Sequence, residues 1–214
     1  MGIIKAMSKP NIENLISGYK EQASKLKNNN DYQNLVKYGQ DPKTLIVSCC
    51  DSRVDPALLF KCGFGDIFVL RTIANIVPKY NKSPNCATAA ALQFVLTKLN
   101  IDDIIILGHS CCAGIAALCN LGNKKPQNNV ESWLAQIRNE KQESLLQYPK
   151  MIKSDIDKKA LNTALQSREN LQSYPWVAAA VKQQKLQLHA WFIEIEAMQL
   201  YAYEDDTNEF KVFS

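Results

Sequence analysis

The sequence predicts an α/β fold in which a central, mostly parallel β-sheet is flanked by helices, with an N-terminal helical arm and an antiparallel C-terminal strand group. Short apolar runs rich in β-branched residues, typical of buried strands, alternate with segments of helical periodicity. The last part of the chain instead alternates apolar and polar residues between short polar turns. With 214 residues, 46% of them hydrophobic, we expect one domain spanning 1–214, with 1–40 as the arm.

The first half of the chain begins with two predicted helices. Residues 10–27 carry apolar side chains at mostly helical spacing, and a second short helix is expected to end before Asp41-Pro42, which prevents its continuation. The apolar runs that follow predict three strands, at 44–47, 66–70 and 103–107. An Ala- and Leu-rich segment before the third strand predicts a crossover helix, and the strands that it joins are therefore expected to be parallel.

The second half is predicted to be helical before its closing strands. A helix after Cys112 is expected to stop at Gly122, and the helical pattern then runs over 130–147 and 155–184 with a break at Tyr174-Pro175. The closing group, with the character of a meander or hairpin at a sheet edge, occupies 186–195, 200–205 and 209–213.

Composition excludes two classes of function. The net charge is +4 and the lysines are scattered, so a nucleic-acid partner is not expected. No apolar stretch approaches the roughly 20 residues that cross a bilayer, and the start of the chain lacks a secretory signal, so no membrane association is expected. The seven cysteines are odd in number and are interpreted as thiols in a reducing compartment, which predicts a cytoplasmic protein.

Two short motifs stand at the carboxyl ends of two predicted strands. The first runs from Cys49 through Asp51 to Arg53, and the second from His109 to Cys112. This edge of an open parallel sheet is where ligands bind. Two thiolates and one imidazole suit zinc, and three protein ligands leave a fourth position open, as in catalytic zinc sites. Asp51 could bind the metal or orient a zinc-bound hydroxide, and a bidentate pair with Arg53 favours the second role.

The order of these residues closely resembles the beta-class carbonic anhydrase family, and the resemblance covers most of the chain. It implies that Cys49, His109 and Cys112 are the zinc ligands, that Asp51 and Arg53 form the catalytic dyad, and that the neighbouring cysteines do not bind metal. The segments that carry it are CCDSRVDP, GHSCCAG, Gly39-Gln40, Asp66–Arg71, Ile73–Pro78, Asn170-Leu171, Tyr174–Val177 and Leu188–Phe192.

The resemblance also implies a function, the reversible hydration of carbon dioxide to bicarbonate and a proton by zinc-bound hydroxide, which makes the protein a lyase. Carbon dioxide would lie against an apolar wall including Phe68 and Ile73, with Gln40 donating a hydrogen bond to it. In the plant-type branch the residues corresponding to Gln40 and Phe68 come from a partner subunit, which implies a homodimer or a higher homo-oligomer.

Three alternatives remain open from the sequence. Hydrolysis of carbonyl sulfide or carbon disulfide would use the same zinc site with a different access channel. A non-catalytic zinc protein would not need the Asp51–Arg53 pair. Thiol redox chemistry would use the two vicinal cysteine pairs, and zinc stoichiometry with a thiol count would distinguish it.

Several positions depart from the strongest family pattern: Thr72 replaces Asn, Ala113 replaces Gly, and Phe94 replaces Tyr. Ile46 stands where the allosteric branch carries Trp, and Arg71 lacks its usual aromatic companions. The sequence therefore resembles the plant-type, non-allosteric branch, with no inhibitory bicarbonate pocket and with water rather than Asp51 on the zinc. His189, the only other histidine, is interpreted as a structural residue.

Overall fold

The computed structural model describes residues 11–82, 85–138 and 148–213, and the chain divides into two compact units, residues 1–40 and 41–214. The first unit contains α1 (Ile12–Lys27) and α2 (Asn30–Tyr38), at the two places predicted for helices. Each helix begins after an asparagine whose side chain accepts a hydrogen bond from the backbone N–H three residues on, which satisfies one of the free donors at a helix start.

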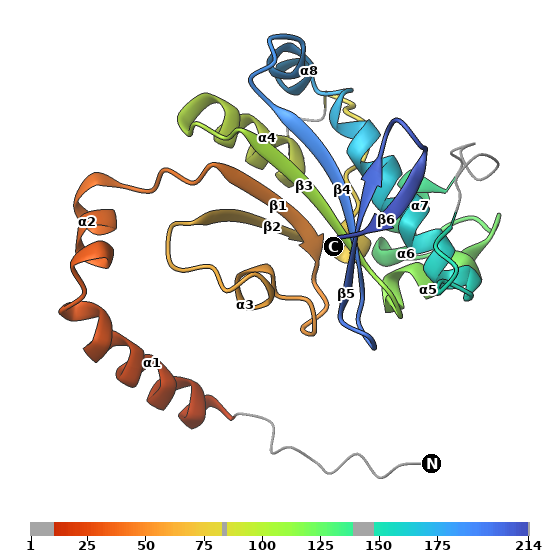
Figure 1. The fold of residues 1–214 in the computed structure, drawn as a ribbon. Helices are drawn as coiled ribbons and strands as arrows, with labels where there is room; N and C mark the ends of the chain where they lie inside the picture. The colour runs from red at the N-terminus through yellow and green to blue at the C-terminus, as the bar shows by residue number, and fades with distance from the viewer. Residues whose placement is uncertain (1–10, 83–84, 139–147, 214) are drawn as a thin grey trace. The chain divides into compact units, whose positions relative to one another are not determined.

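The second unit is built on a six-stranded sheet with the order β2-β1-β3-β4-β5-β6 (Figure 1). The first four strands in this order run parallel to one another, whereas β5 is antiparallel to β4 and β6 is antiparallel to β5. The sheet is therefore mixed but mostly parallel, as predicted. The strands are β1 (Thr44–Cys49), β2 (Ile67–Thr72), β3 (Asp103–His109), β4 (Gln187–Glu194), β5 (Gln199–Glu204) and β6 (Glu209–Val212).

Helices connect the strands and cover mainly one face of the sheet. On that face α7 packs against β3 and β4, α8 packs against α4, and α5 packs against α6 and α7. Gly122, at φ +49°, ends α5 as expected. The helical elements of this unit are α3 (Pro56–Leu59), η1 (Ile73–Asn75), α4 (Ala87–Lys98), α5 (Ala113–Leu121), α6 (Asn129–Leu134), η2 (Ala135–Ile137), α7 (Asp155–Leu171) and α8 (Pro175–Lys182).

The hydrophobic core lies between the sheet and these helices. Alternate side chains of the central strands point to this face, and the burial of each aliphatic side chain contributes about 1.5–3 kcal/mol. A smaller cluster on the opposite face includes Leu59 and Phe60 at the end of α3. The sheet residues of the main core are Leu45, Val47, Cys49, Ile104, Ile106, Ala190, Phe192, Tyr201 and Phe210.

Three details differ from the sequence prediction or extend beyond it. β2 is half-buried along its length rather than fully buried, because it is an edge strand with a single neighbour. β4 pairs antiparallel with β5, as expected for the closing group, and it also pairs parallel with β3, because α7 and α8 provide a crossover before it. The helix predicted over 130–147 is seen as α6 and η2 up to Ile137, while 139–147 lie outside the described residues.

Among the helices of the described ranges, none combines the length and the apolar character that crossing a bilayer requires.

Candidate metal centre

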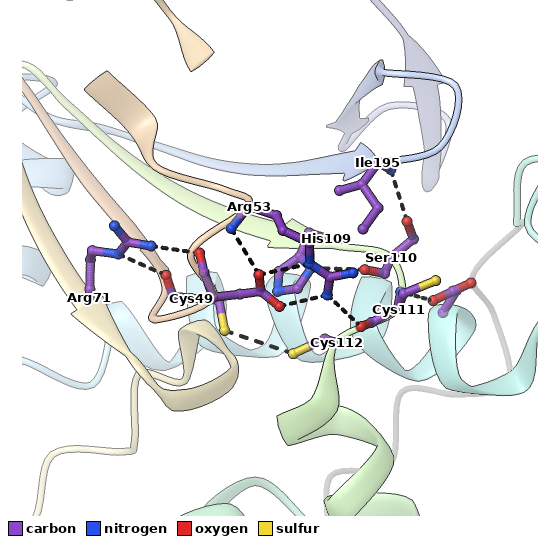
Figure 2. A network of polar contacts seen from close by, with 10 residues as sticks. Cys49, Arg53, Arg71, His109, Ser110, Cys111, Cys112 and Ile195 are labelled. Atoms are coloured by element: carbon purple, nitrogen blue, oxygen red, sulfur yellow. Dashed lines mark hydrogen bonds and ion pairs between the residues drawn. The ribbon is translucent and has the colours of Figure 1, made fainter. Parts of the chain in front are cut away.

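The fold brings the three predicted metal ligands together at one edge of the sheet. Cys49 is the last residue of β1 and His109 the last residue of β3, and these two strands are parallel neighbours. Cys112 lies three residues after His109, at the position directly before the first residue of α5. All three are buried, and their potential ligand atoms lie within 4.8 Å of one another. In Figure 2 the sulfur atoms of Cys49 and Cys112 face each other at 3.9 Å.

The imidazole of His109 is oriented to offer one nitrogen to a ligand. Its Nδ1 lies 2.8 Å from the carbonyl oxygen of Ser110, so Nδ1 carries the proton and donates. The other nitrogen, Nε2, is buried with no hydrogen-bond partner, which is uncommon for a buried polar atom and is explained if the atom binds a ligand. With two sulfurs beside it, this donor set fits zinc.

The two sulfurs already interact strongly with each other. The hydrogen bond from Cys112 is the largest cause that lowers the pKa of the Cys49 thiol, to about 4. The same shared proton raises the pKa of Cys112 far above its ordinary value. The shared proton thus favours the ionised form of one of the two sulfurs, and thiolate is the form that coordinates metal.

Asp51 lies two residues beyond Cys49 and is paired with Arg53 in the bidentate geometry predicted. Arg53 Nε donates to Asp51 Oδ1 at 2.9 Å and Nη2 to Oδ2 at 2.7 Å, while the backbone N–H of Arg53 adds a third bond at 3.0 Å. These bonds, first of all the side-chain bond from Arg53, hold the pKa of the Asp51 carboxyl well below its usual range. The carboxylate is thus ionised and oriented at neutral pH.

The loop between the second and third ligands is held by side chains that the sequence analysis did not identify. Ser110 is buried, its hydroxyl accepts from the N–H of Ile195 at 2.9 Å, and the same hydroxyl lies 3.1 Å from a carboxylate oxygen of Glu194. Cys111 has φ +54°, and its N–H donates to Asp157 Oδ1 at 2.7 Å. Local sequence carries no signal for these contacts, because the partners lie 46 to 85 residues further along the chain.

Arg71 supports the first motif loop from β2. Its guanidinium donates to the carbonyl oxygens of Cys49 at 3.0 Å and Asp51 at 2.7 Å, and to Asp55 Oδ2 at 2.8 Å. Asp55 also caps α3 through its other carboxylate oxygen. The Asp-Pro pair at the start of α3 is a recognisable helix-start signal, so this contact was partly accessible from sequence.

The residues predicted to contact substrate lie in different surroundings. Ile73 is 41% exposed and borders a cavity of about 480 Å³ that Cys50 and Trp133 also line. Phe68 lies on β2 with its ring centroid 6.2 Å from that of Phe94, and it is not among the described residues that line this cavity. Gln40 is the last residue of the first unit, and its contact with substrate remains a prediction.

A glycine permits the close packing of η1 on α5 beside the metal ligands. Ala74 and Asn75 in η1 have φ values of +59° and +48°, a conformation that costs non-glycine residues roughly 1–2 kcal/mol each. A Cβ at Gly114 would lie 3.1 Å from the side chains of Ala74 and Ile73. Any larger residue at Gly114 would therefore push η1 away from the site.

Cys50 and Cys111, next to the ligand cysteines, are exposed, and none of the seven cysteines, all of which lie within the described residues, forms a disulfide. His189, as expected, has a structural partner, because its Nε2 lies 2.7 Å from Asp103 Oδ1. The fold and the site thus define an α/β protein with a buried Cys-His-Cys metal centre at the carboxyl edge of its sheet, and with an ionised aspartate beside that centre.

Known proteins are similar to this chain in both sequence and fold. A family model described as carbonic anhydrase matches residues 44–200. A carbonic anhydrase from Synechocystis sp. is 34% identical over 179 residues, which cover 82% of this chain and 64% of that protein. Beta carbonic anhydrase 3 from Arabidopsis thaliana is 36% identical over 168 residues, which cover 75% of this chain and 63% of that protein. The chain therefore spans less than two thirds of the length of these two relatives.

A solved structure of the beta-carbonic anhydrase CcaA superposes with a TM-score of 0.77 at 28% identity, covering 94% of this chain and 98% of that one. The chain belongs to the carbonic anhydrase family, and within it to the beta class.

Proposed function

We propose that this protein catalyses the zinc-dependent, reversible hydration of carbon dioxide to bicarbonate and a proton. The observation that carries the proposal is the Asp51 carboxylate, which Arg53 holds ionised beside three clustered metal donors. A structural zinc site is normally closed by four protein ligands. Here three donors cluster, and the neighbouring carboxylate is engaged by a guanidinium.

Cys49, His109 and Cys112 would hold zinc, which would supply Lewis-acid chemistry and lower the pKa of water at the site to about 7. Asp51 then has the role of accepting a hydrogen bond from the reacting water and orienting its lone pair toward the substrate. Arg53 keeps that carboxylate directed away from the metal through its two parallel hydrogen bonds. The proton released by the reaction passes to solvent.

Carbon dioxide is small and apolar, so a half-open apolar wall suits it. The exposed side chain of Ile73 and the cavity beside Cys50 support this role. Phe68 and Gln40 complete the binding site in the proposal, contributed by a partner subunit. All these assignments, like those of the metal ligands and the dyad, are tested by substitution.

We assign a homodimer as the smallest active assembly. The described part of the arm exposes apolar side chains that a second copy of the chain would cover: Ile12, Leu15, Ile16, Tyr19, Val36 and Tyr38. Solved beta-carbonic anhydrases from Sordaria macrospora, which are 25% identical with a TM-score of 0.69, are tetrameric. Light scattering on the purified protein tests this assignment, because a monomer at assay concentration would contradict it.

The proposal includes a non-allosteric site and a cytoplasmic location. The Nε, Nη1 and Nη2 atoms of Arg71 all donate to groups of its own chain, which argues against a bicarbonate site at this residue. The seven cysteines, all within the described residues and none of them in a disulfide, fit a reducing compartment. Cooperative inhibition by bicarbonate would contradict the first assignment, and fractionation of the source cells tests the second.

The direct test is stopped-flow hydration of carbon dioxide by protein that has been stripped of metal and then reloaded. We expect the activity to disappear on chelation and to return in proportion to added zinc, up to one ion per chain. The same protein assayed with carbonyl sulfide distinguishes the hydrolase alternative. Protein that carries one zinc per chain and leaves the hydration rate at the buffer value would sink the proposal.

A further inference from the structure

The turn that presents the third metal ligand is strained at the residue before it. Cys111 has φ +54°, a left-handed backbone conformation that residues with a Cβ adopt only when their surroundings hold them there. Cys112, which follows directly, depends on this turn for the direction of its side chain. A group that holds Cys111 in place therefore also places the Cys112 sulfur.

Two side chains from distant parts of the chain hold the peptide groups of Cys111. Its N–H donates to Asp157 Oδ1 at 2.7 Å, and its carbonyl oxygen accepts from Arg53 Nη2 at 3.1 Å. Figure 2 shows Cys111 with a dashed line on each side, one of them to Arg53. The same nitrogen of Arg53, Nη2, also donates a hydrogen bond to Asp51 Oδ2 at 2.7 Å.

Asp157 is well placed to act as a fixed support. It lies in the first turn of α7, and α7 packs against β3, the strand that ends in His109. The helix residues just beyond it, Ala160 and Leu161, are buried in the core. The carboxylate of Asp157 is thus anchored to the strand that carries one ligand and binds the turn that carries another.

We propose that Asp157 is a positioning residue for the metal centre, which holds Cys111 in its left-handed conformation so that Cys112 faces Cys49 and His109. This inference rests on the zinc site of the proposed function and extends it to a residue 45 positions beyond the last ligand. Partners outside the ligand set commonly change metal affinity by 10- to 100-fold when they are removed.

The test measures zinc affinity by competition with a chromogenic chelator in full-length protein. We expect Asp157→Ala to weaken zinc binding by about 10- to 100-fold. Asp157→Asn retains a carbonyl acceptor for the Cys111 N–H and is expected to lose less than about tenfold. In cobalt-substituted protein, the sulfur-to-cobalt absorption bands should shift in Asp157→Ala, because the Cys112 sulfur moves. A general loss of stability would leave those bands unchanged.

Asp155 provides a matched control two residues away. It lies in the same first turn of α7 and is exposed, with an ion pair to Lys158 at 3.0 Å. Removal of either carboxylate changes the charge at the helix start equally. We expect Asp155→Ala to leave zinc affinity unchanged, and an equal loss in the two variants would overturn the assignment.

Combining Asp157→Ala with Cys111→Gly tests the backbone strain at Cys111 directly. It also keeps the proposal testable if Asp157→Ala alone folds poorly. Glycine adopts positive φ without the steric penalty of a Cβ, so Cys111→Gly should remove most of the need for the support. We expect Asp157→Ala to weaken zinc binding less in the Cys111→Gly background than in the wild type. An equal penalty in both backgrounds, or no penalty in either, contradicts the proposal. If wild-type protein binds zinc but does not hydrate carbon dioxide, the proposed function is wrong while the role of Asp157 can still be tested. The comparison of zinc affinities between wild type and the variants does not depend on activity.

Discussion

The two motif loops that meet at the metal centre are held in different ways. The loop from Cys49 to Arg53 is supported by its own Asp51–Arg53 pair, by Asp55 two residues beyond it, and by Arg71 on the adjacent strand β2. The loop from His109 to Cys112 depends on Asp157 in α7 and on residues at the end of β4.

The two loops show that the residues that form a metal site and the residues that hold them in place are encoded differently in the sequence. Ligand types and their spacing are local properties, so a motif displays them. The groups that hold a strained turn in place are brought to it by tertiary packing, so the spacing of residues in the sequence does not predict them. Substitution of nearby residues should therefore disturb the first loop, whereas the second loop should be disturbed by substitution of residues far away in the sequence.

The largest effect is expected from removal of a ligand at either loop. Cys49→Ser and Cys112→Ser should each weaken zinc binding by more than about 100-fold, because loss of a mere supporting contact already costs 10- to 100-fold. The adjacent cysteines are exposed, so Cys50→Ser and Cys111→Ser are the matched controls. Zinc content after dialysis measures the effect, and a control that loses zinc as its neighbour does would show that the ligands are wrongly assigned.

Asp51→Asn should reduce carbon dioxide hydration while zinc stays bound. The amide is neutral and accepts hydrogen bonds more weakly than the carboxylate, so we expect a loss of about 10²- to 10⁴-fold in kcat/KM, the usual range for a proton-transfer group. Hydration rates are compared at equal zinc content. Full activity in this variant would remove Asp51 from the mechanism and leave Arg53 as a structural residue.

Ser110→Ala tests the long-range support of the second loop. It leaves the Ile195 N–H without its acceptor, which costs about 1–3 kcal/mol, and lowers the melting temperature by about 2–4 °C for each kcal/mol in a chain of this size. Ser48→Ala is the control, because the buried Ser48 hydroxyl has no hydrogen-bond partner, and its removal should be neutral or slightly stabilising. Equal melting temperatures for the two variants would argue against this support.

Asp55→Ala tests the local support of the first loop and should have the smallest effect. It removes the cap of α3 and the partner of Arg71, and loss of a cap costs about 0.5–2 kcal/mol. Asp41→Ala, which removes an exposed pair with Lys43, should change stability by less than about 1 kcal/mol. Chemical denaturation measures both, and a larger loss in Asp41→Ala would invert the expected order.

Much of the fold was accessible from sequence, since apolar runs, alternation and helical periodicity predicted the six strands of the described sheet and its longer helices, whereas the short α3 and η1 were not predicted. The edge position of β2 was not, because pairing partners are set by topology and not by composition. The parallel pairing of β4 was missed for the same reason.

At the site, the clustering of Cys49, His109 and Cys112 and the Asp51–Arg53 pairing followed from the two motifs. Asp157 and Glu194 could not be predicted, because nothing in the surrounding sequence marks either as a partner of this loop: Asp157 is one of two acidic residues in the first turn of α7, and Glu194 is the last residue of β4. Only the packing of α7 and β4 against β3 brings these two carboxylates to the loop. Three-dimensional contact was the missing information.

The most direct test of the central claim follows the loss of ¹⁸O label from carbon dioxide to water by mass spectrometry. The measurement uses wild-type protein with one zinc per chain, and the same protein after chelation. Reversible hydration predicts label loss well above the uncatalysed rate for the zinc-loaded protein, and the uncatalysed rate after chelation. Label loss at the uncatalysed rate from fully loaded protein would contradict the account.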